Sequence, residues 1–161
     1  MRTYDVCRPY IDYWVALHRR LHALVHQARR AIKRDGRDEA AALAELTHVL
    51  PLLRAELEHH FAEEDKGGCL EEAVSHCPRL SLEARRIEAE HPRLLDELDR
   101  LTARATAATP ADLTVVEVDL EMFLRRLHSH EAAENELLRQ GFGATVNGMD
   151  EPVASLVDSD E

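Results

Sequence analysis

The fold is decided by residues 127–137, which read LHSHEAAENEL. His130 and Glu134 are four residues apart, and the leucines at 127 and 137 place both of them on the apolar stripe of a helical pattern. Residues three and four apart share one face of a helix, so both side chains point into the core. An unpaired buried carboxylate is costly, whereas a histidine and a glutamate together can bind a metal ion. The stretch therefore predicts a helix that carries metal ligands.

The same His-x-x-x-Glu spacing occurs a second time, in residues 60–64, which read HFAEE. Leu57 lies one helical interval before His60, so His60 and Glu64 also fall on an apolar stripe. No arginine or lysine lies on either stripe to neutralise the buried glutamates. Two such pairs supply half of a cage for two metal ions.

Four long helical patterns cover most of the chain, each with the alternating three- and four-residue steps of an amphipathic helix. A length of 161 residues with 45% hydrophobic residues fits one domain. Short connections make neighbouring helices antiparallel, so we expect an all-α, up-down-up-down four-helix bundle over residues 1–143. The acidic residues 144–161 lack a stripe and are expected to form a flexible tail. The helices are expected from about Pro9 to Asp35 with Gly36 as cap, from Asp38 to just before Gly67-Gly68, from Ser81 as N-cap, and from Pro110 to Gly141.

Two more histidines, His18 and His91, lie on the stripes of the first and third helices. A single histidine on a stripe is more often a hydrogen-bonded core residue than a ligand. In an antiparallel bundle, however, both come to about the same level as the two His-x-x-x-Glu pairs, given the 1.5 Å rise per residue. The predicted metal site therefore consists of His18, His60, Glu64, His91, His130 and Glu134.

The remaining candidates have weaker patterns. His22, on the shoulder of the first helix, is an alternative ligand to His18. Cys69, His76 and Cys77 in the second connection leave open a small thiol site or redox pair, but their spacing alone does not predict a metal. Histidines off the stripes are expected to be solvated or to support the ligands; these are His26, His48, His59 and His128.

The composition excludes several functions. A net charge of −11 argues against binding to nucleic acids or anionic membranes. No apolar run is long enough to cross a bilayer, and the first residues lack the apolar block of a signal peptide. The three cysteines are an odd number and are expected to be reduced. We therefore expect a cytoplasmic protein.

The order histidine, His-x-x-x-Glu, histidine, His-x-x-x-Glu, with one element per helix, resembles the hemerythrin family and its bacterial hemerythrin-like (HHE) cation-binding domains. The resemblance spans about residues 9–141, and the strings EHHFAEE at 58–64, EHPRLL at 90–95 and HEAAENELL at 130–138 carry it. It implies two iron ions in a carboxylate-bridged centre. His18, His60, His91 and His130 would be terminal ligands, Glu64 and Glu134 would bridge, and a solvent-derived oxo or hydroxo group would complete the bridge.

The third helix departs from the classical oxygen carriers, which place a second histidine where this chain has Leu95. The reduced ligand set leaves open positions on the metals and argues against reversible oxygen carriage. It is similar to the hemerythrin-like domains of nitric-oxide-responsive iron-sulfur repair proteins and of iron or oxygen sensors. The repair proteins usually carry an additional N-terminal cysteine-containing domain, and here only Cys7 precedes the expected bundle.

The expected function is a non-haem di-iron protein that binds O2 or NO, or reacts with peroxide, for sensing or stress protection. We expect a metal- and gas-binding protein rather than a dedicated enzyme, and the sequence does not identify a protein partner. One alternative is an iron donor of the repair type. Another is a di-iron oxidase or peroxidase of the ferritin-like kind, using Glu88 with His91 and Glu56 with His59. A third is a metal-free phosphotransfer or interaction bundle using a histidine such as His22.

Overall fold

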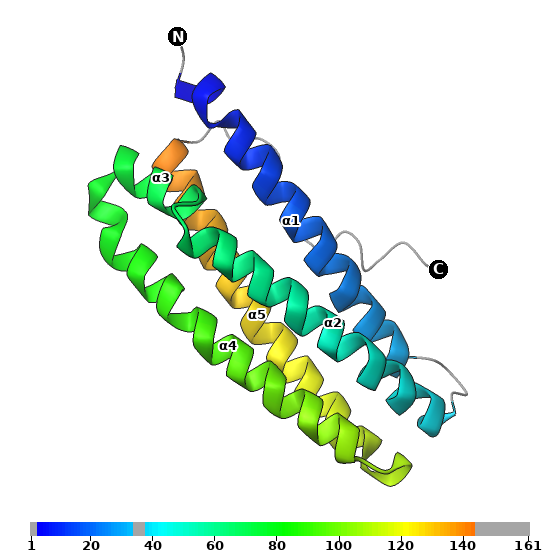
Figure 1. The fold of residues 1–161 in the computed structure, drawn as a ribbon. Helices are drawn as coiled ribbons and strands as arrows, with labels where there is room; N and C mark the ends of the chain where they lie inside the picture. The colour runs from blue at the N-terminus through cyan, green and yellow to red at the C-terminus, as the bar shows by residue number, and fades with distance from the viewer. Residues whose placement is uncertain (1–2, 34–37, 144–161) are drawn as a thin grey trace.

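The computed structural model describes residues 3–33 and 38–143, with side chains from residue 12 onward. Four long helices run side by side along one axis, in alternating directions (Figure 1). Each packs on two of the others, in the cyclic order α1, α2, α4, α5. The predicted all-α four-helix bundle is confirmed. These helices are α1 (Thr3–Ile32), α2 (Glu39–Asp65), α4 (Ser81–Ala107) and α5 (Leu113–Phe142).

The second helix begins and ends as predicted. Asp38 is its N-cap, and the carboxylate of Asp38 accepts a hydrogen bond of 3.0 Å from the backbone nitrogen of Ala40. The helix continues through Pro51 and ends at Asp65. Gly67 follows with a φ of +79°, a left-handed conformation that glycine adopts without strain.

The bounds of the first and third predicted helices differ from the predictions. Helix α1 begins at Thr3 rather than Pro9, so Cys7 lies within it, and it ends at Ile32 rather than Asp35. The predicted cap Gly36 lies outside the described residues, as does Asp35. Ser81 is the first residue of α4 rather than its N-cap, because the 3-10 turn Pro78–Leu80 leads directly into the helix.

The start of the last helix also follows a 3-10 turn, Pro110–Asp112. There the Asp112 carboxylate accepts hydrogen bonds of 2.8 Å from the backbone nitrogen and the hydroxyl of Thr109. At the other end, α5 continues past the predicted stop at Gly141 to Phe142. Gly141 is therefore a residue within the helix.

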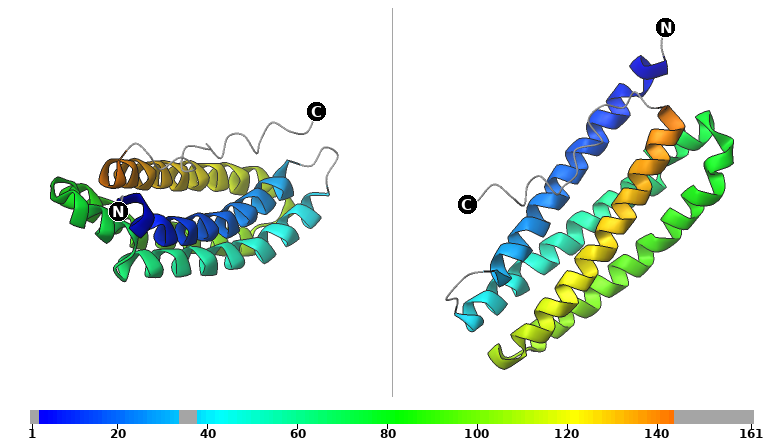
Figure 2. Two further views of the ribbon diagram at one scale, coloured as in Figure 1. Left: turned by 90° about the horizontal axis from the view of Figure 1, so that it is seen from above. Right: turned by 180° about the vertical axis from the view of Figure 1, so that it is seen from behind.

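A short helix, α3 (Cys69–His76), occupies the connection between α2 and α4. It packs mainly on α5, at the end of the bundle where α1 begins and α5 ends (Figure 2). The approach is close, because a Cβ atom on Gly141 would lie 2.5 Å from the Cβ of Ala73. With only eight residues, α3 is too short to show a helical stripe, which is why the sequence did not predict it.

The core consists of two apolar clusters with the predicted metal-site residues between them. The larger cluster includes Leu21, Leu57 and Leu94 and fills the body of the bundle. The smaller cluster, under α3, includes Trp14 and Ile87. Along α1, α4 and α5, the predicted ligands fall between residues of the two clusters, whereas on α2 they flank Phe61 of the larger cluster. None of the helices in the described ranges is long and apolar enough to cross a membrane.

Candidate metal centre

The structure brings together all six residues of the predicted metal site. His18 comes from α1, His60 and Glu64 from α2, His91 from α4, and His130 and Glu134 from α5. All six are buried, and the largest exposed fraction is 6%, for His18. Their side chains form two groups, of four and three residues, whose donor atoms within each group lie within 4.8 Å of one another. Each group is compact enough to hold a metal ion.

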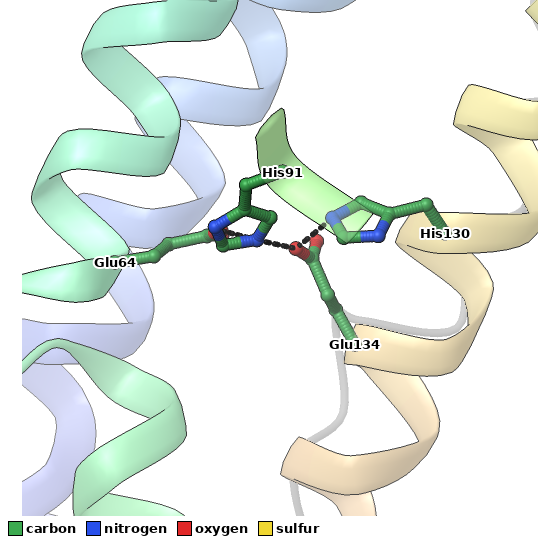
Figure 3. Close-up of side chains that lie close together, drawn as sticks. All are labelled: Glu64, His91, His130 and Glu134. Carbon is green, nitrogen blue, oxygen red and sulfur yellow. Dashed lines mark ion pairs between the residues drawn. The ribbon is translucent and has the colours of Figure 1, made fainter. Parts of the chain in front are cut away.

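The first group consists of Glu64, His91, His130 and Glu134 (Figure 3). Nε2 of His130 lies 2.7 Å from Oε1 of Glu134, and Nε2 of His91 lies 3.3 Å from Oε2 of Glu64. Nε2 of His91 is also 3.8 Å from Oε1 of Glu134. The group thus offers two imidazole nitrogens and two carboxylates from three helices.

The second group consists of His18, His60 and Glu134. The two imidazole rings meet edge to face, with 4.4 Å between their centroids. Nε2 of His18 lies 3.6 Å from Oε2 of Glu134. Glu134 belongs to both groups, so its carboxylate connects them.

Both glutamates direct one oxygen toward each group. Oε1 of Glu64 lies 2.9 Å from Nε2 of His60, while its Oε2 faces His91 of the other group. In the same way, Oε1 of Glu134 contacts His130 and its Oε2 contacts His18. A carboxylate whose two oxygens face two adjacent sites is arranged as a bridge between two ions.

Three of the four histidines are oriented through their outer ring nitrogen. Nδ1 of His18 donates to the backbone oxygen of Trp14 at 3.0 Å. Nδ1 of His91 lies 3.0 Å from Oδ1 of Asp65, and Nδ1 of His130 lies 2.8 Å from Oε2 of Glu90. A proton on Nδ1 leaves the Nε2 lone pair directed at the centre, which is the tautomer that a metal ligand needs.

The inward-facing atoms lack hydrogen bonds. Their contacts are close, but none has the geometry of a hydrogen bond. Buried polar atoms in native proteins nearly always form hydrogen bonds, so a cluster of buried polar atoms without them requires an explanation. Imidazole nitrogens and carboxylate oxygens directed at one small volume are a donor set that suits first-row metal ions such as iron. The atoms are Nε2 of His18, His60, His91 and His130 and both carboxylate oxygens of Glu64 and Glu134.

Without metal, the cluster retains protons. Burial lowers the pKa of His130, but its short contacts with Glu134 and Glu90 outweigh burial and raise that pKa to about 9. For Glu64, burial and then the charge of Glu134 raise the pKa of the carboxyl. For Glu134, burial is outweighed by the contacts with His130, His18 and His91, which hold its pKa well below the usual range. Metal binding must therefore displace protons from the imidazoles.

Glu131, which was not predicted from the sequence, is a buried carboxylate beside the site. It is 6% exposed and comes from α5. Both of its oxygens lie 3.1 Å from Nε2 of His22, and its Oε1 lies 3.9 Å from Nε2 of His18. His22, the alternative ligand considered from the sequence, therefore contacts Glu131 and belongs to neither metal-binding group. Helix packing explains the omission, because Glu131 is one residue off its stripe and is buried by α1.

The other supporting carboxylates, Asp65 and Glu90, gave only a weak signal in the sequence. Each is exposed and lies off the apolar stripe. Only its place next to a predicted ligand in the sequence could have indicated its supporting role. The histidines at 26, 48, 59 and 128 are exposed, as expected. Cys69 and Cys77 are buried and half-buried, and neither belongs to a metal-binding group within the described part of the chain.

The ferritin-like alternative does not match the geometry. It requires Glu56 and His59 to face the centre. His59 is exposed, and Glu56 contacts Arg20 at 3.8 Å. Neither residue belongs to the groups that could hold a metal among the described residues.

A surface groove of about 600 Å³ between α4 and α5 reaches His130. Its lining includes Arg93, Arg100 and Arg125, together with Glu90, the partner of His130.

Leu95, which stands where the classical carriers have a histidine, is only half-buried and packs against the larger apolar cluster. Other apolar side chains near the site are buried, namely Trp14, Leu21, Leu57, Ile87 and Leu127.

Comparison with known families agrees with this geometry. The sequence profile of the Hemerythrin HHE cation binding domain matches residues 10–140, which is most of the chain and includes all six residues of the site. Neither a curated protein nor a solved structure matches the chain significantly. From the length of the family match and the four-helix architecture, the chain belongs to the hemerythrin family.

Proposed function

We propose that the protein binds two iron ions and uses them to bind O2 or NO, or to react with peroxide, in sensing or stress protection. His18, His60, His91 and His130 would be the terminal ligands, and Glu64 and Glu134 the bridging ones. The observation that carries this proposal is the set of inward-facing, buried nitrogen and oxygen atoms without hydrogen bonds, at one level of the core.

The residues of the site would divide the work. The bridging carboxylates offset part of the positive charge of two ions, and the imidazoles, fixed by their Nδ1 partners, hold their lone pairs toward the metals. Bound iron would supply redox chemistry and open positions for a diatomic ligand or peroxide. Because Leu95 supplies no donor beside His91, the open position is expected on the side of His91 and His130.

Access and solvent exclusion also fit this role. The apolar clusters on both sides of the site, including Trp14 and Leu21, keep it dry. The groove between α4 and α5 brings solvent to the outer side of His130. A small uncharged molecule needs only a brief opening between these helices to enter. A dry site with limited access favours a stable metal–gas complex over rapid autoxidation.

The test is metal content and the visible spectrum of protein purified from iron-fed cells, before and after anaerobic reduction, then exposed to air or to NO. We expect about two irons per chain, charge-transfer bands that bleach on reduction, and a new spectrum with the preferred gas. The E64A/E134A double variant should lose the iron. A folded wild-type protein without iron, or a double variant that retains it, would contradict the proposal.

A further inference from the structure

The groove between α4 and α5 carries an excess of positive charge. Its lining holds two carboxylates, Glu90 and Glu97, and four arginines, namely Arg93, Arg100, Arg125 and Arg126. In the chain as a whole the balance is the reverse, with 31 acidic residues against 20 lysines and arginines. A groove in which arginines outnumber carboxylates is therefore unusual for this protein and requires an explanation.

Both carboxylates of the groove already have partners. Glu97 forms an ion pair with Arg126, and Oε2 of Glu90 lies 2.8 Å from Nδ1 of His130. The other three arginines form no ion pair with any residue in the described ranges. All three are exposed, and they come from both sides of the groove: Arg93 and Arg100 from α4, Arg125 from α5. Three guanidinium groups around one hollow, without a carboxylate partner, are arranged to bind an anion.

The size and the remaining lining of the groove fit a small ligand. Its volume of about 600 Å³ lies within the usual range of small-molecule sites. Leu94, which is 5% exposed, adds an apolar contact, and Ser129 adds a hydroxyl group. Arg93 and Arg100 are seven residues apart on one helix, about 10 Å along its axis. Their long side chains can therefore reach one small ligand from two ends.

We infer that the α4–α5 groove binds a small, soluble, phosphate-bearing anion through Arg93, Arg100 and Arg125. The planar guanidinium group presents pairs of N–H donors that match the oxygens of a phosphate group. A phosphate group carries up to about two negative charges and three acceptor oxygens, so it engages more of these donors than one carboxylate does. The inference goes beyond the proposed function and does not require a metal ion in the neighbouring centre.

The test is isothermal titration calorimetry of the metal-free, full-length chain with inorganic pyrophosphate at low ionic strength. Metal is removed because phosphate oxygens also bind metal ions. We expect one pyrophosphate per chain, with an affinity that falls as salt is added, because salt screens exposed charges. The Arg93→Gln/Arg100→Gln variant should bind pyrophosphate at least about tenfold more weakly, since charge-assisted hydrogen bonds are lost. Circular dichroism checks that the variant is folded.

The matched control is Arg85→Gln/Arg86→Gln, which removes the same number of charges from α4. Both arginines are exposed, and neither lines the groove. This variant should bind pyrophosphate with the affinity of the wild type. Vesicles that contain phosphatidic acid present the same chemical group on a membrane surface. We expect the chain not to bind them, because its net charge of −11 opposes approach to an anionic surface.

Three results would overturn the inference. A folded wild-type chain that does not bind pyrophosphate would show that the groove is no anion site. Equal weakening in the two double variants would show that binding depends on net charge and not on this groove. Binding to the vesicles without binding to free pyrophosphate would assign the groove to a lipid headgroup instead of a soluble ligand. None of these results depends on iron, so a failure of the proposed metal site would be seen separately, in the iron content of the wild-type protein.

Discussion

Oε2 of Glu90 lies 2.8 Å from Nδ1 of His130, across the interface between α4 and α5. The carboxylate is half-exposed in the groove, whereas the imidazole is almost completely buried. This single hydrogen bond connects the surface of the protein to the outer nitrogen of a ring whose other nitrogen, Nε2, faces the candidate metal centre. It fixes the ring's orientation and its tautomer.

Removing this bond should weaken metal binding without unfolding the bundle. For Glu90→Ala we expect a loss of about 10- to 100-fold in metal affinity, because His130 can then rotate or take the other tautomer. Competition with a chelator, monitored with Co²⁺, measures the effect. Glu97→Ala is the control, since Glu97 lines the same groove but pairs with Arg126 instead of a ligand. Equal affinities in Glu90→Ala and wild type would contradict the assigned role.

The metal-free protein should lose stability as the pH rises from about 6.5 to 9. The pKa of His130 is about 9 in the folded protein, against 6.5 for an ordinary histidine, so the folded state binds this proton more tightly than the unfolded chain. The resulting stabilisation is complete below pH 6.5 and disappears as the pH passes 9. Urea unfolding of the metal-free protein across this range measures it. His130→Gln should flatten the dependence, and a stability that increases toward pH 9 would refute this explanation.

Gly141→Ala should destabilise the bundle although alanine favours helix. The added Cβ would lie 2.5 Å from the Cβ of Ala73 and 2.8 Å from its Cα, so α3 must move away from α5. We expect a loss of roughly 1–3 kcal/mol in the free energy of unfolding, typical of overpacking. Thermal or urea unfolding measures it, and the Ala73→Gly/Gly141→Ala double variant should recover part of the loss. A more stable Gly141→Ala protein would show that α3 does not pack as described.

Leu95→His should increase iron retention. The new imidazole would lie one helical turn after His91 on α4, close to the group with an expected open position. Iron content after dialysis against a chelator measures the effect, with Leu95→Gln as a control of similar polarity. Unchanged iron content and spectrum would count against this placement of the missing donor.

The sequence by itself determined the four long helices and the six residues that meet in the core. Helical periodicity is a local property, and a polar residue on an otherwise apolar stripe, such as His130 or Glu64, must be buried wherever the helix packs. Asp38 and Gly67 likewise mark the ends of α2 through their own hydrogen bonding and backbone conformation.

Tertiary structure alone decided the features that depend on a neighbouring helix. Glu131 follows His130 directly, and on an isolated helix it would face away from the stripe. It is buried because α1 covers that side and offers His22. Asp65 and Glu90 became partners of His91 and His130 only when α2, α4 and α5 came together. Helix α3 has too few residues to show a period, and it is held in place by its contact with Gly141 on α5. A stripe marks which face of a helix is buried, but which side chains of two helices meet depends on how the helices are rotated and offset in the packed bundle.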